Sequence, residues 1–370
     1  MSRLLIATRK GLFILTRGAG GTWQIGEPAF YGDNCTMVVH DPRDGAIYAA
    51  LNHGHFGCKM HRSDNGGRAW TEIAVPVYPE APAGHQEPQN MMGGKPVPWK
   101  LIQIWELTPG GRDEPGVIWC GTLPGGLFRS SDRGASWEMV RSLWDHPLRQ
   151  QWAGGGYDTP GIHSVLVDPR NSRRITIGVS VGGVWQSGDG GATWRLTSKG
   201  MRAEYMPPER AYEEIVQDPH IVASCLANPD AMWVQHHNGI FRSMDGAATW
   251  TECTRPAVSG FGFAVAVHPR DPKTAWFVPA IKDEKRIPSG GRLVVTKTRD
   301  GGESFETLGN GLPVAHAYDL VFRHALAVDD QGSEVVFGST TGNAYASADG
   351  GARWSRLDAS LPPIYAIRFA

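Results

Sequence analysis

The eight letters SGDGGATW, residues 187–194, decide the fold of this chain, because close copies of them recur along it. The other copies are SDNGGRAW at 63, SSDRGASW at 130, SMDGAATW at 243, TRDGGESF at 298 and SADGGARW at 347. The starts of successive copies, which we call boxes, lie 49 to 67 residues apart. A repeat of about 50 residues that contains short strands is typical of a β-propeller blade.

Each box follows two short apolar segments that have the character of strands. Before the box at 187, HSVLVDPRN ends in a polar turn and IGVSVGGVWQS contains a glycine turn. The unit therefore reads as strand A, a turn, strand B, a glycine turn, strand C, the box and strand D, which starts at the tryptophan. This pattern predicts four antiparallel strands per blade.

The residue types of the box suit a tight turn between strands C and D. Its aspartate can accept hydrogen bonds from backbone N–H groups, and its glycines allow positive φ. The tryptophan then buries a large ring in the sheet packing. Asn65, Ala247 and Phe305 replace the usual residues of three boxes, and we interpret them as local variations of one turn.

A seventh unit is divided between the two ends of the chain. LLIATRKGLFILTRGAGGTW, residues 4–23, aligns with IWCGTLPGGLFRSSDRGASW, residues 118–137, but it lacks a strand A. PIYAIRFA, residues 363–370, reads like a strand A without a blade. The sequence therefore predicts one all-β domain over residues 1–370: a seven-bladed β-propeller of four-stranded antiparallel blades, closed by the C-terminal strand beside the N-terminal one.

The boxes resemble the Asp-box (BNR) repeats of sialidase-like propellers, and the chain resembles bacterial proteins labelled glycosyl hydrolase or exo-alpha-sialidase. The resemblance implies the fold but no single activity, since such propellers include sialidases, xyloglucan-active glycoside hydrolases, sorting receptors and photosystem assembly factors. Sialidase activity is disfavoured: the chain has seven units, and its Arg-Ile-Pro motif starts at Arg286, inside a late insert rather than ahead of the first box.

Composition limits the partners. The formal net charge of −1 provides no field for nucleic acid or an anionic membrane. No apolar run approaches ~20 residues, and the N-terminal segment lacks the features of a signal peptide, so we expect a soluble cytoplasmic protein. Five cysteines without a CxxC motif indicate reduced thiols.

The predicted topology assigns the histidines to two faces. Box turns and A–B turns share one face, and we place His40, His268 and His324 there as turn residues. The D–A loops and B–C turns share the other face, around the channel mouth, where ligands usually bind. Seven histidines fall at this mouth: His163, His220, His236, His237 and His316, with His53 and His55 as second choices. They predict a divalent metal ion, Zn, Mn, Fe or Ni, although scattered hydrogen-bonding histidines are the alternative.

Acid–base and stacking groups are expected at the same mouth. The catalytic candidates are Lys282, Asp283 and Glu284 in the insert AIKDEKRIPSGG, together with Tyr318 and Asp319. The substrate-binding candidates are Arg9, Trp152, Tyr157, Tyr205 and Arg286, from turns and long D–A loops.

Three functions remain open. The first is a metal-assisted hydrolase or lyase acting on a small carbohydrate-like substrate. The second is a metal-free glycoside hydrolase with two carboxylates ~5–9.5 Å apart; Asp283 or Glu284 would pair with Glu213, Asp218 or Asp319. The third is a non-catalytic propeller that binds or assembles a protein partner.

Overall fold

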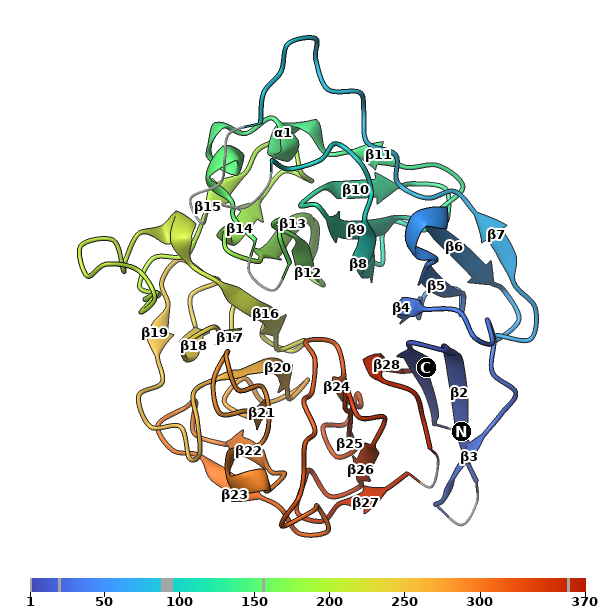
Figure 1. The fold of residues 1–370 in the computed structure, drawn as a ribbon, viewed down its shortest axis with the longest axis vertical. Coiled ribbons are helices and arrows are strands. Elements are labelled where there is room, and N and C mark those ends of the chain that lie inside the picture. The colour runs from blue at the N-terminus through green and yellow to red at the C-terminus, as the bar shows by residue number, and fades with distance from the viewer. Residues whose placement is uncertain (1, 19–20, 88–95, 155–156, 358–359) are drawn as a thin grey trace.

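The computed structural model describes residues 2–18, 21–87, 96–154, 157–357 and 360–370, and it forms the predicted ring of seven four-stranded antiparallel sheets (Figure 1). Strand A of every sheet lies nearest the centre of the ring, and strand D lies at the periphery. The fold class expected from the sequence is confirmed.

Each blade runs from strand A at the centre to strand D at the rim. Blades one to four are β28 (Ile364–Phe369), β1 (Arg3–Thr8), β2 (Gly11–Arg17), β3 (Trp23–Ile25); β4 (Cys35–His40), β5 (Ile47–Asn52), β6 (Cys58–Ser63), β7 (Thr71–Ile73); β8 (Gln103–Pro109), β9 (Ile118–Leu123), β10 (Leu127–Ser130), β11 (Glu138–Met139); and β12 (Ile162–Asp168), β13 (Asn171–Val179), β14 (Gly183–Ser187), β15 (Arg195–Leu196). Blades five to seven are β16 (Pro219–Ser224), β17 (Met232–His236), β18 (Ile240–Ser243), β19 (Thr251–Glu252); β20 (Gly262–Val267), β21 (Ala275–Pro279), β22 (Val295–Thr298), β23 (Glu306–Leu308); and β24 (Leu326–Val328), β25 (Val335–Gly338), β26 (Ala344–Ser347), β27 (Ser355–Arg356).

Helices are few and short in the described ranges. They are α1 (Arg141–Trp144) and the 3₁₀ turns η1 (Gly54–Phe56), η2 (Pro147–Gln151), η3 (Glu214–Val216) and η4 (Ser289–Gly291). No helix among them has the length and apolar character needed to cross a membrane.

The first blade is closed by the C-terminal strand, as predicted. β28 pairs antiparallel with β1, and the register places Leu4 opposite Phe369 and Ile6 opposite Ile367. The two ends of the chain lie side by side in Figure 1. The pairing satisfies the inner edge of β1, which would otherwise be an open sheet edge.

The box at 187–194 shows why this sequence turns. Asp189 Oδ1 accepts hydrogen bonds from Ser187 Oγ (2.8 Å) and the Thr193 backbone N (2.9 Å), while Thr193 Oγ1 donates to Oδ2 (2.6 Å). These bonds lower the pKa of Asp189 to about 2. Gly190 and Gly191 have φ of 79° and 92°, values that favour glycine. In the first box, Asn65 Oδ1 accepts the equivalent backbone bonds, so the substitution preserves the turn.

The boxes lie on the same face as the A–B turns. Backbone hydrogen bonds join the two within a blade, from Gly190 N to Arg173 O and from Gly246 N to Asp230 O. The A–B turn residue His268 has the structural role expected of it, because its Nδ1 faces the backbone N of Arg270 and Asp271 at 3.1 Å. The opposite face is therefore the one that carries the D–A and B–C connections.

The apolar core lies between neighbouring blades. One cluster joins Leu4 and Ile6 of blade one to Val335 of blade seven and Val295 of blade six. Five tryptophans are the largest fully buried side chains. Trp152 lies in a loop, and the other four lie on middle strands, namely Trp119, Trp185, Trp233 and Trp276. Packing between blades leaves the centre of the ring to the A strands and to the polar groups at their ends.

Candidate functional site

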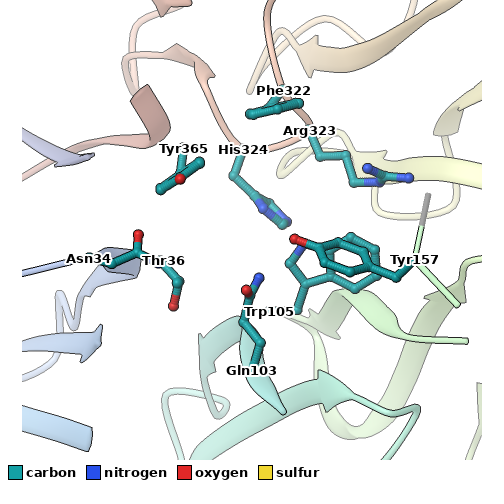
Figure 2. A pocket seen from close by; sticks show the side chains of 9 residues that line it. All are labelled: Asn34, Thr36, Gln103, Trp105, Tyr157, Phe322, Arg323, His324 and Tyr365. Carbon is teal, nitrogen blue, oxygen red and sulfur yellow. The ribbon is translucent and has the colours of Figure 1, made fainter. Parts of the chain in front are cut away.

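A pocket of about 320 Å³ opens where the A strands begin, on the face opposite the boxes. Figure 2 shows side chains from blades one, two, three and seven around it, with one residue from the loop before blade four. Its lining residues are Asn34, Thr36, Gln103, Trp105, Tyr157, Phe322, Arg323, His324 and Tyr365. The pocket combines aromatic walls with a few polar groups, as small-molecule sites usually do.

Blade five places a buried carboxylate beside two imidazoles. Asp218 directly precedes β16, His220 lies in β16 and His237 directly follows β17. Asp218 Oδ2 lies 3.5 Å from His220 Nε2 and 3.3 Å from His237 Nδ1. Asp218 and His220 are buried, whereas His237 is half-buried and faces the mouth loops. We call these three residues the triad.

The hydrogen bonds around the triad fix the proton on His220. Its Nδ1 lies 2.6 Å from the carbonyl oxygen of Gly262, which can only accept, so Nδ1 carries the proton and donates. Burial lowers the pKa of His220, although the nearby carboxylate of Asp218 raises it. The net decrease favours the neutral imidazole ring. The other ring nitrogen, Nε2, faces Asp218 Oδ2 at 3.5 Å, so a cation held there would contact both atoms.

The triad has the donor set of a transition-metal site. Two imidazoles and one carboxylate suit ions such as Zn, Mn or Fe, and the bond from His220 to Gly262 is the usual outer support of a ligating histidine. All three ligand atoms lie within 4.8 Å of one another. Within the described residues, this is the one group of three or more His, Cys, Asp or Glu side chains with such spacing.

The triad includes two of the seven predicted metal histidines. His236 instead supports it, because its Nε2 accepts a 3.0 Å hydrogen bond from the backbone N of Asp218. His163 is fully buried with Nδ1 2.9 Å from Ser164 Oγ, and its Nε2 has no partner in the described structure. The remaining predicted ligands, His316, His53 and His55, lie outside the group. His53 lies 3.7 Å from Asp33, and the His55 ring packs against Phe56 with ring centroids 3.9 Å apart.

Among the catalytic candidates, Asp283 and Glu284 interact electrostatically with His237 of the triad. Burial lowers the pKa of His237, but the hydrogen bond to Asp218 and the charges of Asp218 and Asp283 outweigh this effect and raise it. Lys282 and Glu284 pair with each other at 3.1 Å in the exposed part of the insert. Tyr318 is 61% exposed.

Asp319 does not serve the site as expected. Its Oδ1 accepts hydrogen bonds from Ser339 Oγ (2.6 Å), Thr341 Oγ1 (2.6 Å) and Asn343 Nδ2 (2.9 Å). These partners form the B–C turn of blade seven, so the carboxylate holds that turn in place. The hydrogen-bonding capacity of Asp319 Oδ1 is therefore already used by these partners within blade seven.

The substrate-binding candidates have different roles: some lie at or near the pocket, and others pack against the loops. Tyr157 lines the pocket, and Arg9 lies close enough to lower the pKa of the pocket residue Tyr365, although burial raises it overall. Arg286 packs over Phe263 at 5.3 Å and pairs with Asp283.

The other two candidates pack the loops. Trp152 is buried against Trp185, with ring centroids 5.7 Å apart. The Tyr205 hydroxyl donates to the carbonyl of Val216, while its ring lies 5.0 Å from His237. Tyr205 thus positions the triad without offering its hydroxyl to a substrate.

Sequence reasoning missed two pocket residues, Arg323 and His324. The placement of His324 in an A–B turn is wrong: its Nε2 lies 2.7 Å from the carbonyl oxygen of His163 and 3.0 Å from Glu106 Oε2, at the centre of the ring. Strand β24 is short and starts two residues later, at Leu326, so the irregular segment before it disguised the register. The signal that could have found His324 is its position close to the start of strand A, where His163 is the second residue of β12 in blade four.

Comparisons with known proteins agree on the propeller. No protein-family model matches the chain. A probable oligoxyloglucan-reducing end-specific xyloglucanase of Neosartorya fischeri is 26% identical over 223 residues, which are 52% of this chain and 25% of that protein. A xyloglucanase of Hypocrea jecorina is 24% identical over 175 residues, 44% of this chain and 20% of the relative. The chain therefore spans a quarter or less of the length of these relatives.

Solved structures show the same fold at low identity. The GH74 xyloglucanase from Xanthomonas campestris superposes with a TM-score of 0.63 at 18% identity, over 96% of this chain and 52% of that one. YCF48 from Cyanidioschyzon merolae superposes with a TM-score of 0.54 at 14% identity, over 89% and 87% of the two chains. These likenesses support the seven-bladed architecture.

Proposed function

We propose that the protein is a carbohydrate-active hydrolase that binds a small glycan-like substrate at the channel mouth and holds a divalent metal ion at Asp218, His220 and His237. The carbohydrate-active part is supported by the relatives named as xyloglucanases. Membership of the Asp-box propellers rests on the boxes and is part of the same proposal.

One observation carries the metal: His220 Nε2 and His237 Nδ1 lie 3.5 Å and 3.3 Å from the same carboxylate oxygen, Asp218 Oδ2. Such a bound ion would polarise a substrate oxygen or lower the pKa of bound water. His220 is held by Gly262 and Asp218 by His236, so the ligands are preorganised. Asp283, which the insert places near His237 and which pairs with Arg286, is the half-buried carboxylate that would accept a proton at the mouth.

A second candidate is a metal-free glycoside hydrolase. Asp218 and Asp283 both raise the pKa of His237, so two carboxylates approach one imidazole at the mouth. One buried and one half-exposed carboxylate could divide the roles of acid and base. This candidate needs no bound metal ion, whereas the metal enzyme does, and the metal content can be measured directly.

Elemental analysis of protein purified without affinity metals, followed by assays of reducing-sugar release from xyloglucan and other oligosaccharides, tests both candidates. For the metal enzyme we expect about one metal ion per chain, chelator-sensitive activity, and loss of both in Asp218→Asn and His237→Ala. His316→Ala is the matched control, since this exposed mouth histidine lies outside the triad.

The outcomes separate the two candidates. Activity that persists in a metal-free sample and is lost in Asp283→Asn would favour the carboxylate pair. Absence of sugar release from every substrate, with or without added Zn, Mn or Fe, would overturn the enzymatic function and leave a binding propeller.

A further inference from the structure

Arg323 is a buried cation that has no ion-pair partner among the residues the structure describes. The residue is 8% exposed, and among the described residues its guanidinium forms no hydrogen bond or ion pair; Nε is buried without a partner. Burial lowers the pKa of Arg323 to about 10, so the group is still charged at neutral pH. Burying an unpaired charge is unfavourable, and proteins normally pair such a group.

The surroundings of Arg323 leave the edge of its guanidinium free. The guanidinium carbon lies 4.9 Å from the Trp105 ring centroid and 5.1 Å from that of Phe263. Aromatic rings hold a guanidinium by cation–π contact without using its N–H groups. Figure 2 shows the side chain beside Trp105 and Tyr157 at the pocket. Its donors are therefore available to a ligand in this pocket.

A second unpaired group lies in the same pocket. Asn34 Oδ1 is buried without a hydrogen-bond partner in the described structure, so it can accept a bond from a ligand hydroxyl. Trp105, Tyr157 and Tyr365 supply flat faces that suit the carbon face of a ring. The volume of about 320 Å³ fits a small molecule rather than a wide polymer.

The charges around the pocket select a single negative charge. His324 is engaged with Glu106 at 3.0 Å, and Arg286 is paired with Asp283. Burial lowers the pKa of Arg323 and the charge of Asp218 raises it, so Asp218 lies near enough to oppose a second negative charge on the ligand. One planar guanidinium matches one carboxylate through two parallel N–H···O bonds.

We propose that the channel-mouth pocket binds a small carboxylic acid with a hydroxylated ring, the class that includes sugar acids. Arg323 holds the carboxylate, Asn34 accepts from a hydroxyl, and the aromatic walls cover the ring. This inference rests on the proposed function only because it names the class of substrate that binds at the same channel mouth. Binding of the acid itself requires neither metal nor catalysis.

Calorimetric titration of the full chain, in buffer with chelator, tests the pocket. The probes are glucuronate and galacturonate, with glucose as the neutral analogue and inorganic phosphate as the alternative anion. We expect at least one uronate to bind more tightly than glucose and phosphate. Arg323→Gln should weaken uronate binding by roughly 10- to 100-fold, and Arg323→Lys by less, since it retains the charge but loses the fork.

One further measurement keeps the result unambiguous. The Tm of ligand-free Arg323→Met should equal or exceed that of the wild type, because it removes an unpaired buried charge; a large fall would indicate a structural role instead. Because the titration is run with chelator present, failure of the metal proposal would not affect this one. Equal binding of glucose or phosphate, unchanged uronate affinity in Arg323→Gln, or no binding of any probe would overturn the inference.

Discussion

His163 couples the stability of the fold to pH. The side chain is fully buried in β12, at the centre of the ring, with its imidazole edge-on to Trp105 at 5.6 Å. Burial lowers its pKa well below the usual range, the charges of Arg323 and His324 lower it further, and Asp218 opposes them. An unfolded histidine titrates near pH 6.5. Below that pH, the unfolded chain binds a proton at this site that the folded chain does not.

Protonation at this site therefore favours the unfolded chain. The contribution of His163 to stability is fully present above about pH 6.5 and is lost as the pH falls toward the depressed folded pKa, at up to about 1.4 kcal/mol per pH unit. His163→Phe keeps an aromatic ring against Trp105 but cannot take up a proton. Urea unfolding between pH 7.5 and 5.5, with chelator present, should show a shallower loss of stability for the variant. Parallel curves over this range would mean that His163 is not neutral in the folded protein.

At the scale of the turn element, the tryptophan of the box is a stability residue. Trp194 is 8% exposed, and its Nε1 donates to the carbonyl of Gly191 at 3.2 Å. Trp194→Ala should lower the free energy of unfolding by about 3–5 kcal/mol, as for other buried aromatic truncations. Trp23→Ala, in the degenerate box of blade one, should cost less because that ring is only half-buried. Denaturant unfolding measures both.

The same variant tests the assignment of the two faces. The box joins the A–B turn, whereas the pocket opens at the start of the A strands. Folded Trp194→Ala should therefore keep its affinity for metal and for any mouth ligand. Lost affinity at full stability would contradict the placement of the site.

The elements were predictable because a local signal repeats. Each box reports its own turn through side-chain hydrogen bonds within eight residues, and the spacing of boxes then counts the blades. Adjacent residues at the end of a strand point to opposite faces, so His236 and His237 could not both be ligands. This alternation can be read from the sequence, and it correctly separates His236, which supports the triad, from His237, which belongs to it.

Arg323 could not be found in this way. Its importance depends on burial between Trp105 and Phe263, which are far from it in the sequence and reach it only through the ring. The same is true of Asp319, whose carboxylate looks free in the sequence but is held by a turn about twenty residues away. Contacts between distant segments decide which polar groups are used up, and no local pattern reports them.

At the scale of the whole molecule, stability depends on ring closure. Ile364, Ala366 and Ile367 of β28 are fully buried, and the strand provides the innermost position of blade one. Deletion of residues 363–370 would remove this packing and leave β1 with an open edge. We expect the truncated protein to show no cooperative thermal transition and to aggregate. A melt like that of the full chain would contradict the closure.

A circular permutant tests whether ring closure needs only the strand β28 or also needs the chain ends at their natural position between β28 and β1. The Ala370 backbone N donates to the carbonyl of Arg3 at 3.0 Å, and β28 and β1 are antiparallel neighbours. An Asn-Gly linker placed directly between Ala370 and Arg3, with Met1 and Ser2 omitted, can therefore join the ends as a two-residue hairpin. New ends between Ala257 and Val258 fall in an exposed connection between β19 and β20. The permutant keeps every blade and should unfold cooperatively, with a Tm close to that of the parent, when followed by circular dichroism. A second permutant, opened at another exposed D–A connection, is the control. If both permutants fail to fold, the natural position of the ends is itself required. Strand pairing between β28 and β1 would then not be sufficient to close the ring.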